Sequence, residues 1–237
     1  MSQSPSLSIV IPCLNEEGAI AGVVRESMTV LSSMTDVYDV VVIDDASTDN
    51  TQRELSALLS EYPEHLKVIT NPKTIGCHPS SLIGFRAAKG DYRLFIPGDH
   101  QIPAAEFPKF LAEALKGADV VYSWRVHRAD PFHRRLISGL YNLVVRTCLG
   151  IRLHDVDSAS MLSAKAVETL LPHVTAENAF ITVDMLIQSK KLAITVGEAV
   201  IDHHPRRTGE AKGLNLKDLS KVPGSFLKML WWVWTRR

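Results

Sequence analysis

The 237-residue sequence has little of several features that would each assign it to a class of protein. Its three cysteines, Cys13, Cys77 and Cys148, lie far apart and match no metal-binding pair, which suits a reducing compartment. Basic and acidic residues number 26 each, and no aromatic-basic motif occurs, so we expect no nucleic-acid partner. A run of about 20 apolar residues and a secretory signal segment are both absent, so we expect a cytoplasmic chain without a membrane span.

Glycine-rich nucleotide motifs are absent too, because no G-x-G-x-x-G follows the first apolar segment and no P-loop occurs. The chain contains instead a regular alternation of apolar strands and helices. We expect strands at Leu7–Pro12, Val40–Ile43, Leu66–Thr70 and Leu94–Ile96, separated by helices at Ala19–Met34, Thr51–Glu61 and Pro79–Lys89. This order predicts an α/β fold in which helices flank both faces of a mostly parallel, Rossmann-like sheet.

The pattern is less regular after Gln101. There we expect helices at Ala104–Lys116, Arg134–Leu149, Lys165–Leu171 and Phe180–Lys191, and strands at Asp119–Trp124 and Ala193–Ile201. Residues 155–160 read as a polar turn before Met161 and Leu162. We assign residues 1–212 to one domain and residues 213–237 to a C-terminal amphipathic, helical tail.

The segment Leu94–Gln101 combines a buried strand with polar residues placed directly after it. Pro97 and Gly98 end the strand, since proline cannot extend a central strand and glycine allows the chain to turn. Asp99 and Gln101 follow, and their side-chain oxygens are suitable ligands for Mg²⁺ or Mn²⁺. The alternative is an aspartate that bonds to nearby backbone amides in a turn.

Acidic residues also follow the first two strands. Glu16 lies in the loop after the first strand, and Asp44 comes directly after the second. In an open parallel sheet, ligands bind outside the carboxyl ends of the strands, so these acids and Asp99 should share one crevice. Such a cluster needs a cation or hydrogen-bond donors to compensate its charge, and a metal-bound sugar nucleotide offers both. The alternative for Glu16 and Asp44 is that each stabilises a helix N-terminus.

These motifs resemble those of the family 2 glycosyltransferases, whose fold is the nucleotide-sugar-binding GT-A type. The matching segments are Ile9–Glu16, Val42–Asp49 and Gly90–Gln101. Looser matches point to the polyprenyl-phosphate branch, typified by dolichol-phosphate mannosyltransferase; they lie at Leu149–Gly150, Asp155–Ser158 and Arg206–Lys212.

The resemblance implies roles for individual residues. The donor would be bound by Pro12, Leu14, Glu16, Asp44, Gly98, Asp99, Arg206 and Lys212. Asp99 and Gln101 would hold the metal. The phosphate of the acceptor would face Arg125, Arg134, Arg135 and Ser138. Asp99 and Arg125 would be catalytic, and Asp184 matches the base of relatives that use a hydroxyl acceptor. The alternative for Asp184 is an acid on a helix surface or a structural partner of an arginine.

Two residues depart from the family pattern. Pro97 stands where the family usually has the first aspartate of Asp-x-Asp, which bears on metal binding. Met161 stands where the branch commonly has an arginine, which bears on the acceptor more than on the donor.

We therefore predict an inverting glycosyltransferase that moves a sugar from GDP-mannose or a UDP-sugar to polyprenyl phosphate. Three tryptophans beside basic residues in the tail, at residues 231, 232 and 234, suit a membrane interface at the cytoplasmic face. The tail could instead pack on the domain or on a second subunit of a homo-oligomer. One alternative function keeps the family but uses a hydroxyl acceptor with Asp184 as base. A second is a nucleotide-sugar-binding protein with weak or no turnover.

Overall fold

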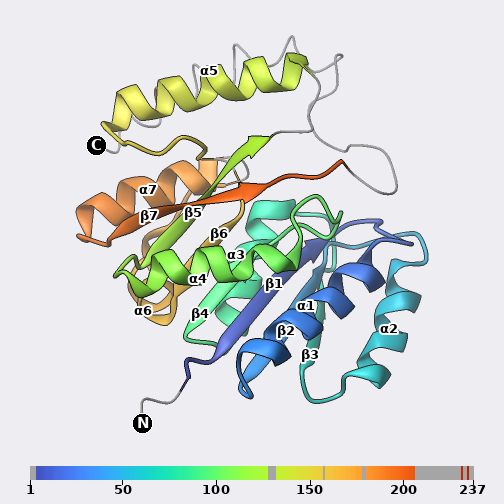
Figure 1. Cartoon of the computed structure of the whole chain (residues 1–237). Coiled ribbons are helices and arrows are strands. Elements are labelled where there is room, and N and C mark those ends of the chain that lie inside the picture. The colour runs from blue at the N-terminus through green and yellow to red at the C-terminus, as the bar shows by residue number, and fades with distance from the viewer. Residues whose placement is uncertain are drawn as a thin grey trace.

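A computed structural model of the chain describes residues 4–127, 132–156, 158–177 and 180–205, together with Trp231 and Trp234. Its centre is a seven-stranded sheet in the order β3-β2-β1-β4-β6-β5-β7 (Figure 1). The strands are β1 Leu7–Cys13, β2 Tyr38–Asp44, β3 Leu66–Thr70, β4 Tyr92–Phe95, β5 Val120–His127, β6 Ser160–Ser163 and β7 Val196–Asp202. All neighbouring strands are parallel except β6, which is antiparallel to both β4 and β5.

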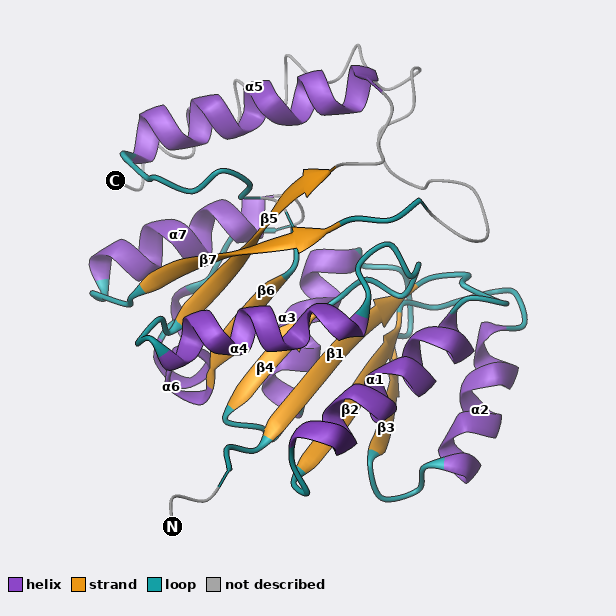
Figure 2. Cartoon of the chain, in the orientation of Figure 1, coloured by secondary structure: helices purple, strands orange, loops and turns teal. Residues whose placement is uncertain are grey.

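Helices cover both faces of the sheet, as the sequence predicted (Figure 2). They are α1 Ile20–Met34, α2 Thr51–Glu61, α3 Cys77–Ala87, α4 Phe107–Leu115, α5 Phe132–Leu149, α6 Ala164–Thr169 and α7 Ile181–Lys191, with 3₁₀ turns η1 Ala104–Glu106 and η2 Leu171–His173. Among the described helices, none combines the length and the apolarity needed to cross a bilayer.

The core has two layers, one on each side of the sheet. Ile9 and Ile11 of β1 pack with apolar residues of α1, α2 and α4. Val10, between them, belongs to the opposite layer with residues of α3, α6 and α7. Because alternate side chains of a strand point to opposite faces, a strand covered on both faces must be apolar at every position. This requirement explains the uninterrupted apolar runs in the sequence.

The strand β6 was missed by the sequence analysis, which expected a polar turn up to Ser160. Instead Ser160 pairs with Phe95 and Met161 pairs with Leu94, so β6 lies between β4 and β5. A strand of four residues that begins and ends with serine is too short to display an alternating pattern. Met161 has no exposed surface, so it is part of the core.

The chain adds strands to the sheet on one side of β1 as far as β3, and on the opposite side of β1 from β4 onward. From β1 the chain moves to β2 and then β3 on one side, whereas β4 lies on the other side of β1. In open α/β sheets, ligands bind outside the carboxyl ends of the strands at the point where the strand order reverses. The loops that follow β1 and β4 contain Glu16 and Asp99, respectively.

Candidate active site

The loop after β4 is held against β1 on one side and β7 on the other. The Gly98 amide donates to the Pro12 carbonyl at 3.1 Å. A side chain at Gly98 would meet the Cys13 Cβ at 2.9 Å, so only glycine fits this approach without movement. On the other side, the Gln101 carbonyl accepts a hydrogen bond from the His204 amide at 2.9 Å. The half-buried Asp99 accepts the Gln101 amide on Oδ1 at 3.1 Å, which folds the loop into a tight turn.

The loops after β1 and β2 clasp each other through side chains and backbone amides. The Glu16 amide donates to Thr51 Oγ1 at 2.8 Å, and the Thr48 amide donates to Asn15 Oδ1 at 2.7 Å. Asn15 has a positive φ of 49°, a conformation that asparagine tolerates better than most residues. These bonds bury Glu16, which is 8 % exposed, beside the N-terminus of α2.

Asp44 and its neighbour Asp45 are both buried but have different partners. Asp44 accepts the Ser47 amide at 3.0 Å and the side-chain amide of Gln52 at 2.9 Å. Asp45 accepts the amides of Ile75 and Gly76 at 2.9 and 2.8 Å and thereby shapes the loop after β3. Burial acts to raise the pKa of Asp45, but these hydrogen bonds outweigh it, so the pKa lies below its ordinary value.

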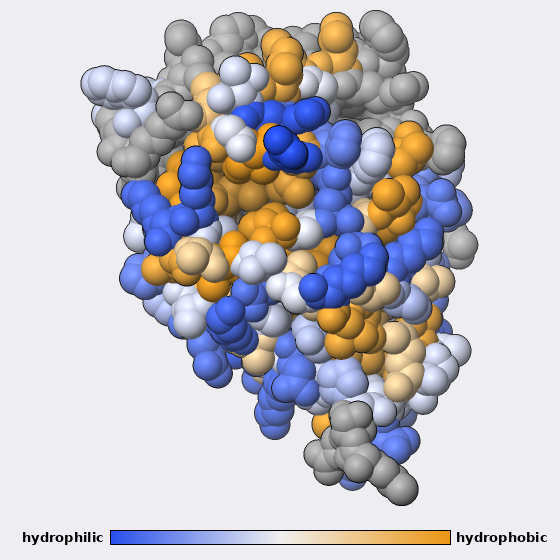
Figure 3. Space-filling view, turned by 60° about the vertical axis from the view of Figure 1, so that its left-hand side comes forward, coloured by the Kyte–Doolittle hydropathy of each residue, from blue (hydrophilic) through white to orange (hydrophobic). Residues whose placement is uncertain are grey.

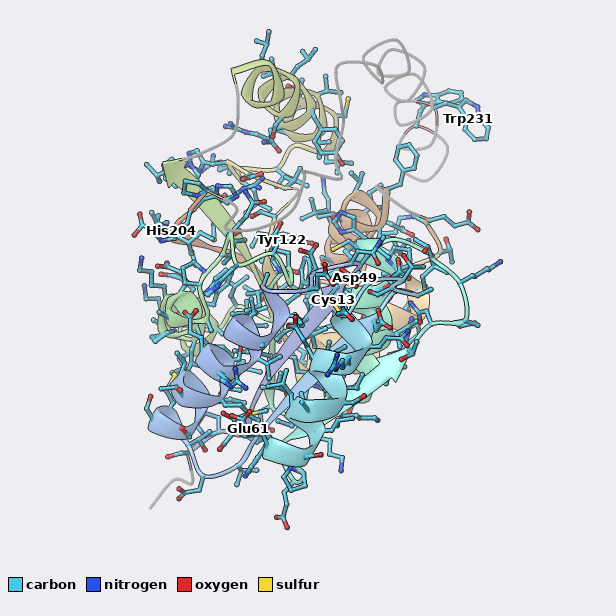
Figure 4. All side chains as sticks on the ribbon, turned by 90° about the vertical axis from the view of Figure 1, so that its right-hand side faces the viewer. Cys13, Asp49, Glu61, Tyr122, His204 and Trp231 are labelled. Atoms are coloured by element: carbon cyan, nitrogen blue, oxygen red, sulfur yellow. The ribbon has the colours of Figure 1, made fainter. Side chains whose placement is uncertain are left out.

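Glu16, Asp44 and Asp99 therefore lie at the same carboxyl end of the sheet, as the sequence predicted. β1, β2 and β4 are parallel, and Asp44 is in register with Cys13 at the end of β1. Figure 4 shows Cys13 and Asp49, from the loop after β2, together at this end, with His204 on the far side of the same end. Pro12 and Gly98 are buried, and Leu14 is half-buried, within the same group of loops.

The residues at this end fit a divalent cation only if a ligand supplies further oxygens. Asp99 and Gln101 offer a carboxylate and an amide oxygen two residues apart. In the described part of the chain, no group of three or more His, Cys, Asp or Glu side chains could hold a metal by itself. Mg²⁺ commonly binds through one or two carboxylates plus substrate phosphates, and this donor set matches that arrangement. Pro97 contributes no ligand, so the diphosphate would have to complete the coordination.

Arg125, at the same end of β5, is held by a buried carboxylate. Its Nε and Nη2 donate to the two oxygens of Asp155 at 2.6 and 3.1 Å, and the two side chains are 12 % and 5 % exposed. A planar guanidinium is suited to bind a phosphate as well as a carboxylate, and this one has a fixed orientation. The preceding residue, Trp124, stacks on His154 with ring centres 3.8 Å apart, and this contact fixes the same segment.

Asp184 is fully buried in the first turn of α7, so the alternative of an acid on the helix surface is wrong. Its Oδ2 accepts the amides of Thr175 and Ala176 at 2.7 and 2.8 Å, and Oδ1 accepts the side chain of Gln188 at 3.0 Å. These bonds give Asp184 a structural role in the turn before α7. Its role as a base remains a prediction.

The remaining predicted residues lie partly outside the described structure. Ser138 is half-buried on α5. Arg134 and Arg135 belong to the same helix, but their side chains are not described, and Arg206 and Lys212 lie outside the described residues.

Sequence reasoning missed two partners of the predicted site residues. Asp155 orients Arg125, and Gln52 covers Asp44. Asp155 is 30 residues from Arg125, and no spacing rule links a strand end to a loop that far along the chain. Gln52 is in the first turn of α2, and an exposed polar residue is ordinary at that position.

Comparison with known proteins gives three findings. The family model "Glycosyl transferase family 2" matches residues 8–171. Two curated relatives are undecaprenyl-phosphate 4-deoxy-4-formamido-L-arabinose transferases. The one from Yersinia enterocolitica is 26 % identical over 215 residues, covering 90 % of this chain and 64 % of its own. The one from Shewanella sediminis is 30 % identical over 206 residues, covering 87 % and 61 %. The chain thus spans less than two thirds of the length of these relatives.

Solved structures give the same fold. The glucosyl-3-phosphoglycerate synthase of Mycobacterium tuberculosis, in complex with Mn²⁺, UDP and glucosyl-3-phosphoglycerate, superposes with a TM-score of 0.72. It is 20 % identical and covers 97 % of this chain and 80 % of its own. The same enzyme with UDP alone gives a TM-score of 0.68.

Proposed function

Since the chain belongs to glycosyltransferase family 2, we propose that it is an inverting sugar transferase that binds a nucleoside-diphosphate sugar at the carboxyl end of β1, β2 and β4. The observation that carries the proposal is the convergence of Glu16, Asp44 and Asp99 at this end, next to the reversal of strand order. GDP-mannose or a UDP-sugar is the donor, and the UDP complexes of the structural neighbour support the second.

In this proposal, each group of residues has one task. Glu16 and Asp44, with Pro12 and Leu14, hold the base and ribose, while Gly98 lets the loop after β4 approach them. Asp99 and Gln101 hold Mg²⁺ or Mn²⁺, which supplies positive charge to the leaving diphosphate. Arg206 and Lys212 would add positive charge to the same phosphates.

Polyprenyl phosphate is the proposed acceptor. The two relatives named above carry undecaprenyl phosphate in their names, which supports this choice. A phosphate oxygen of the acceptor attacks the anomeric carbon, the bond from that carbon to the diphosphate breaks, and the nucleoside diphosphate leaves. The attacking oxygen is already anionic, so no strong base is needed. Arg125, fixed by Asp155, would orient the acceptor phosphate together with Arg134, Arg135 and Ser138.

A hydroxyl acceptor would require a carboxylate base, and this is the second candidate. The Asp184 carboxylate already accepts two backbone amides and one side-chain amide, and it is fully buried. These contacts hold the carboxylate in the turn before α7, where it has a structural role. We therefore place the phosphate acceptor first.

An exposed apolar surface suits an acceptor that resides in a membrane. On α5, Val145 and Leu149 are buried in the core, whereas Leu136, Leu140 and Leu143 are 63, 52 and 59 % exposed. Spacings of four and three residues place these leucines on one helix face. Figure 3 shows a hollow with an apolar surface in the upper half of the molecule, and Figure 1 shows α5 at the top of the same half.

We propose that this leucine face rests on the cytoplasmic surface of the membrane. Trp231 and Trp234 are 66 and 77 % exposed, and Figure 4 places Trp231 in the same upper part of the molecule. Tryptophan favours the interface between lipid and water, so these side chains also suit contact with a membrane surface.

The donor site is tested by metal-dependent nucleotide binding. The protein should bind GDP or UDP in the presence of Mn²⁺, measured by calorimetry, and Asp99→Ala should weaken that binding at least tenfold. Asp36→Ala is the matched control, because Asp36 is exposed and precedes β2 at the opposite end of the sheet. Equal binding by wild type and Asp99→Ala would refute the metal site. Binding without release of nucleoside diphosphate from any donor would favour a binding protein that lacks turnover.

The acceptor is tested by the chemical nature of the product. With radiolabelled donor and polyprenyl phosphate in detergent, label should enter an organic-soluble, acid-labile product. Label in a water-soluble product that requires a hydroxyl acceptor, and that disappears with Asp184→Asn, would support the second candidate instead.

The membrane surface is tested by sedimentation with vesicles of phosphatidylglycerol and phosphatidylethanolamine. Changing Leu136, Leu140 and Leu143 together to serine should reduce the bound fraction. Leu115→Ser, at the end of α4, is the control, because Leu115 is equally exposed at 62 %. If both variants lose vesicle binding equally, or if neither loses it, the proposed role of α5 is refuted.

A further inference from the structure

His100 lies between the two proposed metal ligands in the sequence, and its ring contacts helix α1. Its ring is buried, and it packs against Gly22 of α1, where an added Cβ would lie 3.7 Å from two ring atoms. The backbone of His100 has a positive φ of 61°, which is unfavourable for a residue with a side chain. Such a conformation persists only where surrounding contacts enforce it. The contacts of the ring are therefore among those that hold the loop of Asp99 and Gln101 in place.

The enforcing contact comes from Glu26 on α1. One of its carboxylate oxygens, Oε2, lies 2.5 Å from His100 Nε2, and the other, Oε1, accepts the Ala105 amide at 3.2 Å. The side chains of His100 and Glu26 are 10 % and 27 % exposed. The Glu26 carboxylate thus attaches both ends of the segment 100–105 to helix α1.

The position of Glu26 connects the two halves of the donor site. Helix α1 begins at Ile20, and the Glu16 carbonyl accepts the amides of Ala19 and Ile20 at 3.1 and 3.0 Å. The loop that carries Glu16 and the loop that carries Asp99 are therefore both fastened to the first half of α1. Helix α1 is thus one element that contacts both loops.

A neighbouring pair shows what a purely stabilising contact on α1 looks like. Arg25 pairs with Glu61 of α2 at 2.8 Å, with side chains 54 and 39 % exposed, and it joins two helices without touching a site loop. Glu26 differs because it bonds to a backbone amide and to a strained residue of a loop with proposed ligands.

We propose that Glu26 is a positioning residue of the metal and donor site, acting through His100 and the Ala105 amide to fix the orientation of Asp99 and Gln101. This inference rests on the proposed function of the site. Loss of a residue that orients a metal ligand commonly lowers metal affinity about 10- to 100-fold.

The test combines metal binding with amide exchange in the full chain. Mn²⁺ binding is measured by calorimetry with saturating UDP or GDP, using the nucleotide that raises the melting temperature of the wild type more. Glu26→Ala should weaken Mn²⁺ binding about tenfold and, without metal or nucleotide, speed hydrogen exchange in residues 99–105. Glu26→Asp keeps the charge but is one methylene shorter, so it should resemble Glu26→Ala. Glu26→Gln keeps the reach and one acceptor, so it should recover most of the affinity. Glu61→Gln is the control and should leave both measurements unchanged.

The following results would overturn the proposal for Glu26. If Glu26→Asp binds Mn²⁺ with wild-type affinity while Glu26→Ala binds it weakly, the charge of residue 26 supports metal binding and the position of its carboxylate does not. That result would overturn the proposal. Unchanged exchange in residues 99–105 of Glu26→Ala would also overturn it. If the wild type binds neither nucleotide with Mn²⁺, the proposed function fails. In that case the positioning proposal fails as well. Faster exchange in Glu26→Ala would then show only that Glu26 anchors residues 99–105.

Discussion

Adding one methyl group at Gly98 tests both the packing of the site and its function. The new Cβ of Gly98→Ala would lie 2.9 Å from the Cys13 Cβ, 3.3 Å from the Pro12 carbonyl oxygen and 3.4 Å from the Ile20 Cδ1. Ordinary contacts begin near 3.4 Å, so about 0.5 Å of movement is needed. Cys13 and Pro12 belong to the central strand β1 and are buried, so the loop after β4 must yield instead.

The cost follows from comparable insertions into packed interiors. Overpacking by one methyl group costs about 1–3 kcal/mol. For a protein of this size, 1 kcal/mol lowers the melting temperature by about 2–4 °C. Gly98→Ala should therefore melt roughly 2–12 °C below the wild type in a calorimetric scan. Because the displaced loop carries Asp99 and Gln101, the stabilisation that Mn²⁺ and nucleotide give the wild type should shrink as well.

Gly139→Ala is the matched control for this substitution. Gly139 is an exposed residue within α5, and an added Cβ there would meet no described atom within 4 Å. Alanine favours a helix over glycine by about 1 kcal/mol, so this variant should melt no lower than the wild type. An unchanged melting temperature and unchanged nucleotide response in Gly98→Ala would refute the close approach of the loop to β1.

Three further predictions concern buried polar groups, with unfolding measured in urea unless stated. Asp155→Ala should lower the free energy of unfolding by about 3 kcal/mol because it removes the buried partner of Arg125, and the double change Arg125→Met with Asp155→Leu should recover most of it. Tyr122→Phe should raise the free energy of unfolding by about 1 kcal/mol, seen as a higher urea midpoint at constant slope, because the hydroxyl is fully buried and has no partner among the described residues; burial raises its pKa. The pKa of Asp45 is lowered, so its contribution to stability is complete above its ordinary pKa near 3.8 and is lost as the pH falls through the folded-state value. Asp45→Asn should therefore be less stable at pH 7, and its melting temperature should fall less than that of the wild type in acid; a parallel fall would contradict the assigned hydrogen bonds.

The sequence was a good guide where a structural rule acts over a short distance. Strands β1 and β2 appear as largely apolar runs because both faces of each strand are covered, whereas β3 lies at the edge of the sheet with Lys67 and Thr70 exposed. The position of Asp99 after β4 followed from Pro97 and Gly98, which end a strand by their own conformational limits. The common location of Glu16, Asp44 and Asp99 followed from one further rule, that parallel strands end on the same side.

Partners that are distant in the sequence could not be predicted in this way. Glu26 meets His100 across 74 residues, and Arg125 meets Asp155 across 30. Each of these residues looks ordinary in its own segment, because an acid on a helix or in a loop has no local signature of what it contacts. β6 was missed for a related reason, since its two outer serines are buried or half-buried by neighbours that no local pattern reveals.

The antiparallel strand β6 has a consequence for synthesis of the chain on the ribosome. β4 pairs with β1 on one side as soon as both have emerged, but its other side stays unpaired until residues 160–163 arrive. An unpaired central strand is a template for pairing with another chain. Nascent chains that end before residue 160 should therefore recruit chaperones or self-associate. For the same reason, a break in the chain between β5 and β6 would divide the protein into pieces that each lack a complete sheet.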